Sequence, residues 1–112
     1  MPVEVKIRVV ECAITIMHAA SGKEKDFEKL LSKELHVIMK AKGMQGAVLM
    51  RYQGEPATYL TIAFWDSRGD WYSCMQESKL RERMRPYLLK NPRTRWYRTI
   101  ARAQGAEFKG PK

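Results

Sequence analysis

Apolar residues follow two different spacings along the chain, and these spacings predict alternating strands and helices. Residues 8–17 (RVVECAITIM) are rich in Val, Ile and Thr and predict a first strand. Residues 47–52 (AVLMRY) and 58–65 (TYLTIAFW) predict a hairpin, because Pro56 interrupts the strand pattern between them. Residues 95–101 (RWYRTIA) predict the last strand. Segments 8–17 and 58–65 hardly alternate between polar and apolar side chains, which indicates that both of their faces are covered.

The segment after the first strand carries apolar residues at intervals of three and four, the pattern of a helix with one buried face. The Ser21-x-x-Glu24 spacing matches a capping box, so we expect Ser21 to be the N-cap. The same pattern predicts that the helix ends near Gly43. His36 falls away from the apolar stripe and is interpreted as a solvated surface residue.

A second helical segment comes after the third strand. Asp66 or Ser67 is expected to be its N-cap, and the helix is expected to begin near Arg68. The apolar stripe is interrupted at residues 77–78, and Pro86 is expected to cut the segment short.

The resulting order, strand–helix–strand–strand–helix–strand, predicts an α+β fold of the ferredoxin-like βαββαβ type. In this fold an antiparallel four-stranded sheet has its helices on one face. The other face would expose apolar residues of the first and third strands, and a second copy of the chain is the simplest cover, so we expect a homodimer. At 112 residues and 13.1 kDa there is room for one domain, expected at residues 8–101 between an extension (1–7) and a flexible basic tail (102–112).

Composition narrows the class of protein. The chain is 45% hydrophobic and 29% charged, a composition that excludes a chain disordered throughout. It has no apolar run long enough to span a membrane. Cys12 and Cys74 lie in apolar contexts without a CxxC spacing, so we expect reduced, buried thiols. The chain start has no signal-peptide pattern, and the expected location is the cytoplasm.

The net charge of +9 is concentrated at one end of the sequence. Twelve of the 21 basic residues, but only four of the 12 acidic ones, come after Ser67. Such a basic segment, with Tyr87, Trp96 and Tyr97 interleaved, is compatible with phosphate contacts, with a small anionic ligand or simply with solubility. The third strand lacks the glycine pattern of RNA-recognition domains, which makes nucleic acid the less favoured partner.

Three passages of the sequence resemble the antibiotic biosynthesis monooxygenase (ABM) family of dimeric α+β barrel proteins. They are Ser-Gly-Lys-Glu at 21–24, Gly-Met-Gln-Gly-Ala at 43–47 and, most specifically, Ile-Ala-Phe-Trp-Asp-Ser-Arg at 62–68. The resemblance covers roughly residues 10–100 and implies that two sheets pair as a dimeric α+β barrel. The family includes cofactor-free oxygenases of phenols and quinols, haem-degrading enzymes and members without a known substrate, so the resemblance alone leaves the activity open.

One departure from the family concerns haem. Haem-degrading relatives take an axial histidine from the helix after the Trp and pair it with an asparagine in the first strand. Here the histidine position holds Cys74, the last histidine is His36 and the first asparagine is Asn91. A haem-binding or haem-degrading activity is therefore the less favoured interpretation.

An oxygenase needs a metal, a flavin or a substrate electron-rich enough to reduce oxygen itself. The sequence has no metal-ligand cluster and no glycine-rich nucleotide loop, so we expect no cofactor and a phenol or quinol substrate held in an apolar pocket between sheet and helices. The candidate catalytic residues are Trp65 and Tyr72. The candidate pocket residues are His18, Arg51, Tyr52, Tyr59, Trp71 and Cys74. Aromatic residues at strand ends are also common in cores, and the alternative function is a non-catalytic module that binds a small ligand or nucleic acid with the C-terminal basic face.

Overall fold

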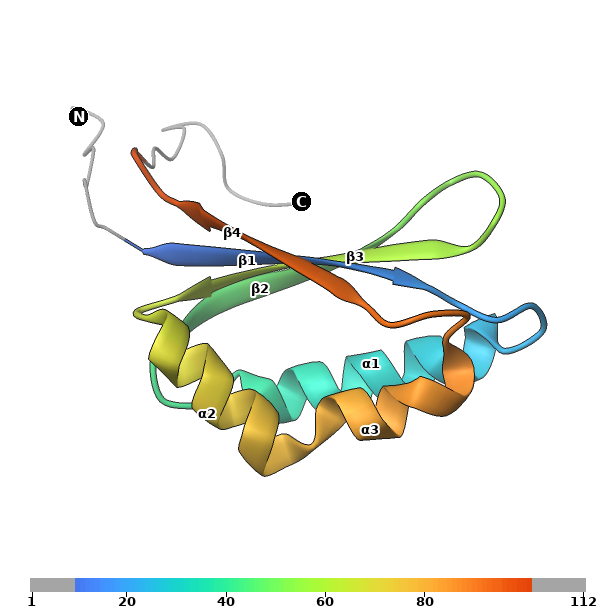
Figure 1. Ribbon diagram of the computed structural model, residues 1–112, viewed down its shortest axis with the longest axis horizontal. Coiled ribbons are helices and arrows are strands. Elements are labelled where there is room, and N and C mark those ends of the chain that lie inside the picture. Colours follow the sequence, from blue (N-terminus) through green and yellow to red (C-terminus); the bar gives the residue numbers. More distant parts are fainter. Residues whose placement is uncertain (1–9, 102–112) are drawn as a thin grey trace, which may run out of the picture.

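The computed structural model describes residues 10–101, and the expected extension and tail lie outside this range. The elements, in chain order, are β1 (Glu11–His18), α1 (Glu24–Ile38), β2 (Met44–Arg51), β3 (Thr58–Trp65), α2 (Arg68–Ser78), α3 (Leu80–Met84), the 3₁₀ helix η1 (Arg85–Tyr87) and β4 (Arg93–Arg98). The strands form one antiparallel sheet in the order β2-β3-β1-β4. All helices lie under one face of this sheet (Figure 1). The predicted ferredoxin-like α+β fold is confirmed.

The start and end of α1 differ from the prediction. Ser21 is not its N-cap: Lys23 takes this position and makes no side-chain cap. The reason is a tight turn, in which Gly22 adopts a φ of +84° and the N–H of Lys23 donates to the carbonyl of Ala20. The helix ends at Ile38 rather than near Gly43, and a series of turns fills the gap.

The predictions for β3 and α2 are confirmed more closely. Strand β3 covers Thr58–Trp65, and Ser67 is the N-cap of α2, with its hydroxyl accepting from the N–H of Asp70 at 3.1 Å. The expected interruption occurs at Lys79, whose left-handed φ of +53° separates α2 from α3. Strand β4 begins two residues before the predicted start, at Arg93 rather than at residue 95.

The main core lies between the sheet and α1. Phe27 is fully buried, its ring meeting that of Tyr59 edge-to-face at 5.3 Å and stacking on Tyr87 at 6.1 Å. Met17 and Leu31 pack into the same cluster. Burying side chains of this size stabilises the fold by about 1.5–3 kcal/mol each.

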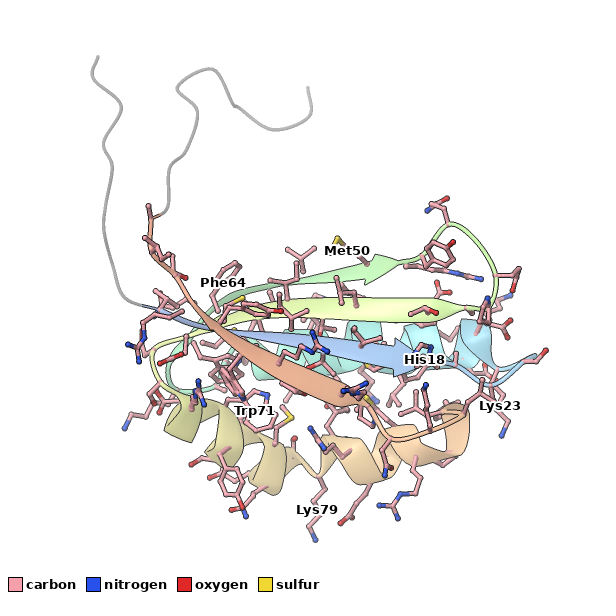
Figure 2. The ribbon with its side chains drawn as sticks, turned by 45° about the horizontal axis from the view of Figure 1, so that its top comes forward. His18, Lys23, Met50, Phe64, Trp71 and Lys79 are labelled. Atoms are coloured by element: carbon pink, nitrogen blue, oxygen red, sulfur yellow. The ribbon has the colours of Figure 1, made fainter. Side chains whose placement is uncertain are left out.

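The sheet face opposite the helices is uncovered in the single chain and is mostly apolar along β1, β2 and β3, whereas β4 adds Arg93 and Arg95. Cross-strand pairs on this face include Ile14–Ile62, Ile16–Leu60 and Val48–Ile62. Figure 2 shows Met50 and Phe64 on this side of the sheet, away from the helices. Ile16, Val48, Met50 and Tyr97 are exposed large hydrophobic residues. Contiguous apolar surface of this kind marks an interaction site.

Candidate functional site

Short side chains form two rows on the helix-facing side of the sheet. The rows, read across neighbouring strands, are Ala47–Ala63–Ala13 and Thr61–Thr15–Thr94. Because alanine and threonine fill little of the space below the helices, a gap is left between the two layers. A partly open cavity of ≈ 80 Å³ lies over these rows.

The roof of the cavity comes from all three α-helices. Leu31, Glu34, Leu35 and Ile38 of α1, Trp71 and Met75 of α2, and Leu80, Arg81 and Met84 of α3 line it. Met17 and Met44 add two further thioethers from the sheet layer. Methionine side chains are flexible and repack easily. Because an apolar cavity of about 150 Å³ is one that binds benzene, we expect these side chains to rearrange when an aromatic ring enters the smaller cavity.

Trp65 closes one end of the cavity. Its side chain is 1% exposed, and its indole N–H has no hydrogen-bond acceptor among residues 10–101. The end of β3 is held by the N–H of Asp66, which donates to the carbonyl of Gly43 at 2.8 Å. Gly43 has a φ of +83°, and a Cβ at this position would collide with Asp70, so the site needs glycine. Buried donors are nearly always paired, so the unpaired indole N–H of this wall residue is an exception.

Glu34 brings a carboxylate to the cavity wall. It is 4% exposed, and Arg83 of α3 binds it in a bidentate manner, with Nη1 2.7 Å from Oε1 and Nη2 2.8 Å from Oε2. This ion pair connects α1 to α3 across the roof. Such charge-assisted pairs fix orientation as well as adding energy.

Arg81 lies where the cavity meets β4. Its Nη2 donates to Thr94 Oγ1 at 3.4 Å, and Thr94 Oγ1 lies 2.9 Å from Thr15 Oγ1. The guanidinium also stacks over the Trp71 ring at 5.8 Å, and Trp71 in turn meets Trp96 edge-to-face at 5.2 Å. Figure 2 shows Trp71 between α2 and β4. Arg81, Trp71 and Thr94 form the wall of the cavity here, and Trp96 packs against Trp71 without lining the cavity.

The structure brings two of the predicted site residues together at the cavity, Trp65 and Trp71. Tyr72 is 58% exposed and does not line the cavity, although its ring lies 6.5 Å from that of Trp71. Tyr52 is exposed at the end of β2. The catalytic role of Trp65 stays a prediction, and the residue lies in the cavity wall. The catalytic role of Tyr72 also stays a prediction, but in the single chain this residue lies outside the cavity.

Arg51 and Tyr59 meet at Glu28 rather than at the cavity. Arg51 Nη1 and the Tyr59 hydroxyl both donate to Glu28 Oε2 at 2.6 Å, and the guanidinium lies over the Tyr59 ring. Burial, followed by the hydrogen bond to the Glu28 carboxylate, raises the pKa of Tyr59 to about 12. The cluster ties α1 to the hairpin and keeps the phenol protonated.

His18 and Cys74 also lie away from the cavity. His18 is at the end of β1, on the same sheet face as Ile14 and Ile16, with Nδ1 3.4 Å from Thr58 Oγ1. Cys74 lines an outer groove between α1 and α2. Burial, with the negative charge of nearby Glu77, raises the pKa of the Cys74 thiol, which disfavours the thiolate that a haem ligand requires.

Sequence reasoning missed the alanine and threonine rows, Glu34 and Arg81. A signal for the rows was present, because Ala13 and Thr15, like Thr61 and Ala63, alternate with large apolar residues. Glu34 interrupts the apolar stripe of α1, and a charged residue at such a position indicates a buried partner.

Two other kinds of site are absent from the described part of the chain. Residues 10–101 contain no group of three His, Cys, Asp or Glu side chains arranged to hold a metal ion. Within the same range, no helix combines the length and apolarity needed to cross a bilayer. The cavity over the alanine and threonine rows, with Trp65, Trp71 and Glu34 in its walls, is the candidate site.

Comparisons with known proteins agree with this architecture. The family model for antibiotic biosynthesis monooxygenase matches residues 12–83, whereas the search of curated proteins gives no match. A putative antibiotic biosynthesis monooxygenase from Nitrosomonas europaea superposes with a TM-score of 0.75 at 9% identity, covering 85% of this chain and 93% of that one.

Two further solved structures share the fold. A variant of SnoaB, a cofactor-independent oxygenase from Streptomyces nogalater, has a TM-score of 0.65 at 13% identity, over 91% of this chain and 98% of that chain. A dimeric ferredoxin-like protein from an uncultured marine organism has a TM-score of 0.62 at 16% identity, over 93% and 95%. At such low sequence identities, these structural similarities establish the common fold alone. The family is established by the family model, which matches more than half of the sequence. The chain belongs to the antibiotic biosynthesis monooxygenase family.

Proposed function

We propose that the protein is a cofactor-independent monooxygenase that oxidises a phenol or quinol in the cavity between sheet and helices. The observation that carries the proposal is the buried indole N–H of Trp65, which has no acceptor among the described residues in the wall of a largely apolar cavity. Membership of the family and the likeness to SnoaB support it.

The chemistry needs no external reductant. Oxygen reacts slowly with closed-shell molecules, but an ionised phenol is electron-rich enough to give it an electron. Recombination forms a C–O bond at the para carbon, and the resulting hydroperoxide loses water to leave a quinone. The ring loses the phenolic proton and the para hydrogen, one oxygen atom becomes the new carbonyl, and the other leaves as water. All electrons that reduce oxygen come from the ring.

The cavity residues have distinct roles in this proposal. A hydrogen bond from the Trp65 N–H to the substrate oxygen favours the phenolate, because a donor to the charged form lowers its pKa. Glu34 is the carboxylate in the wall that can accept the phenolic proton, held in place by Arg83. Leu31, Ile38 and the methionines exclude water from the ring.

Oxygen uptake tests this function. With a panel of monocyclic and bicyclic phenols and quinols, we expect uptake that is unchanged by EDTA and a decrease in kcat/KM of about 100-fold in Trp65→Phe, the effect of removing one donor to a developing oxyanion. Trp96→Phe is the matched control, because Trp96 does not line the cavity, and its kcat/KM should stay within about threefold of wild type.

The absence of uptake across the whole panel would refute the proposal and favour a non-catalytic binding module. An equal loss in Trp65→Phe and Trp96→Phe would show that the indole acts through general packing rather than through its N–H.

We further propose that the working unit is a homodimer formed through the open sheet face. The apolar pairs on this face support it, as does the dimeric ferredoxin-like neighbour. Cys12 and Cys74 are free thiols, which supports a reducing compartment such as the cytoplasm.

A further inference from the structure

A second, outer pocket of ≈ 390 Å³ lies at the C-terminal end of the helical layer and is rich in cations. It is lined by Arg81, Arg85, Leu88, Leu89, Lys90, Asn91 and Pro92. We propose that this basic pocket binds a carboxylate carried by the substrate, so that the substrate is an anionic aromatic compound. This inference rests on the proposed function, which places the aromatic ring of the substrate in the cavity between sheet and helices.

The cations of the basic pocket have no carboxylate partner in the part of the chain that the structure describes. No carboxylate of residues 10–101 forms an ion pair with Arg81, Arg85 or Lys90. Arg83 and Arg98 of the same basic segment are paired, with Glu34 and Glu11. Arg81, Arg85 and Lys90 thus bring three positive charges without an ion pair among the described residues to the walls of one pocket.

The basic pocket and the cavity share part of their walls. Arg81 and Pro92 line both. Arg81 reaches inward to Thr94 at 3.4 Å while its neighbour one turn along the chain, Arg85, lies in the outer pocket only. A molecule whose ring occupies the cavity and whose carboxylate is joined by a short chain would place the anion beside Arg81, which can bind it in a bidentate manner.

The arrangement of the basic residues favours a small anion over nucleic acid. Arg93 and Arg95 pair with Ile16 and Ile14 in β1 and so lie on the open sheet face, away from the basic pocket. With Arg83 and Arg98 engaged by carboxylates, the cations do not form one continuous track for a phosphate backbone.

The experiment compares 3-(3-hydroxyphenyl)propanoate, whose para carbon is free for the proposed oxidation, with its neutral primary amide by calorimetry under anaerobic conditions. We expect the carboxylate to bind about tenfold more tightly than the amide, the contribution of one charge-assisted contact. Arg85→Gln and Lys90→Gln should each remove most of this preference while leaving the affinity for the amide unchanged. Lys33→Gln, which removes an exposed charge of α1, is the matched control and should keep the preference.

Three results would overturn the proposal: equal affinities of wild type for carboxylate and amide, an equal loss in Lys33→Gln, or tighter binding of a single-stranded RNA oligonucleotide that competes for Arg85 and Lys90. The same measurements distinguish this proposal from the proposed function. A carboxylate preference without oxygen uptake would refute the monooxygenase activity but not carboxylate binding in the basic pocket. Rapid oxidation of neutral phenols only would refute carboxylate binding but not the monooxygenase activity.

Discussion

Val48→Asp is expected to convert the protein from a dimer to a monomer. Val48 lies on β2, pairs with Ile62 and is 48% exposed in the single chain, on the apolar sheet face. In a face-to-face dimer the new carboxylate would be buried without a partner, at a cost of several kcal/mol. A two-fold interface contains each residue twice, so the dissociation constant should rise by at least about 1000-fold.

Sedimentation velocity at micromolar concentration measures this effect. The matched control is Val37→Asp, because Val37 is 56% exposed on α1, in the layer away from the open sheet face. We expect wild type and Val37→Asp to sediment as dimers and Val48→Asp as a folded monomer with unchanged circular dichroism. A monomeric wild type, or a Val48→Asp protein that stays dimeric, would contradict the proposed interface.

Arg83→Met is expected to lower the free energy of unfolding by about 3–5 kcal/mol, the cost of leaving a buried carboxylate unpaired. Glu34 is buried in the cavity roof, and both of its oxygens are engaged by Arg83. Urea denaturation at neutral pH measures the change. The same roof holds α1 against α3, so loss of the pair also loosens the cavity.

A double substitution separates the buried charge from general packing. In Glu34→Leu with Arg83→Met the unpaired carboxylate is gone, and most of the lost stability should return. Arg81→Met serves as the single-site control, since the hydrogen bond of Arg81 to Thr94 is exposed and its loss should cost about 1 kcal/mol or less. A double variant as unstable as Arg83→Met would show that the arginine acts through its packing.

The elements that the sequence predicts well are those set by local patterns. The β-branched and aromatic run of β3 and the Ser67 cap each depend on a few neighbouring residues, and both are found where expected. The predicted start of α1 at Ser21 is wrong, because the turn at Gly22 takes the place of the first helical turn. The same residues are compatible with a capping box and with a tight turn, and sequence patterns do not show which of the two is more stable.

The cavity could be predicted only in part. The resemblance to the family placed a pocket between sheet and helices, and Trp65 lies in its wall. The alanine and threonine rows depend on the register of β1 against β3, which pairs Ala13 with Ala63 and Thr15 with Thr61. Register is a property of the folded sheet, so neither strand alone reveals the gap. The aromatic type of Tyr59 suggests a pocket residue, and it lies on the same sheet face as Thr61 and Ala63, but its bond to Glu28 and its packing against Phe27 place it in the core.

Isotope labelling with ¹⁸O₂ shows whether the oxygen atom added to the substrate comes from molecular oxygen, as a cofactor-independent monooxygenase requires. A phenol that supports oxygen uptake is incubated with the EDTA-treated protein, and the quinone is reduced at once to its quinol so that its oxygen does not exchange with water. We expect one labelled oxygen atom per product molecule from ¹⁸O₂, none from H₂¹⁸O, and a slower rate in Trp65→Phe. Label derived from water, or an unlabelled product formed together with hydrogen peroxide, would contradict it.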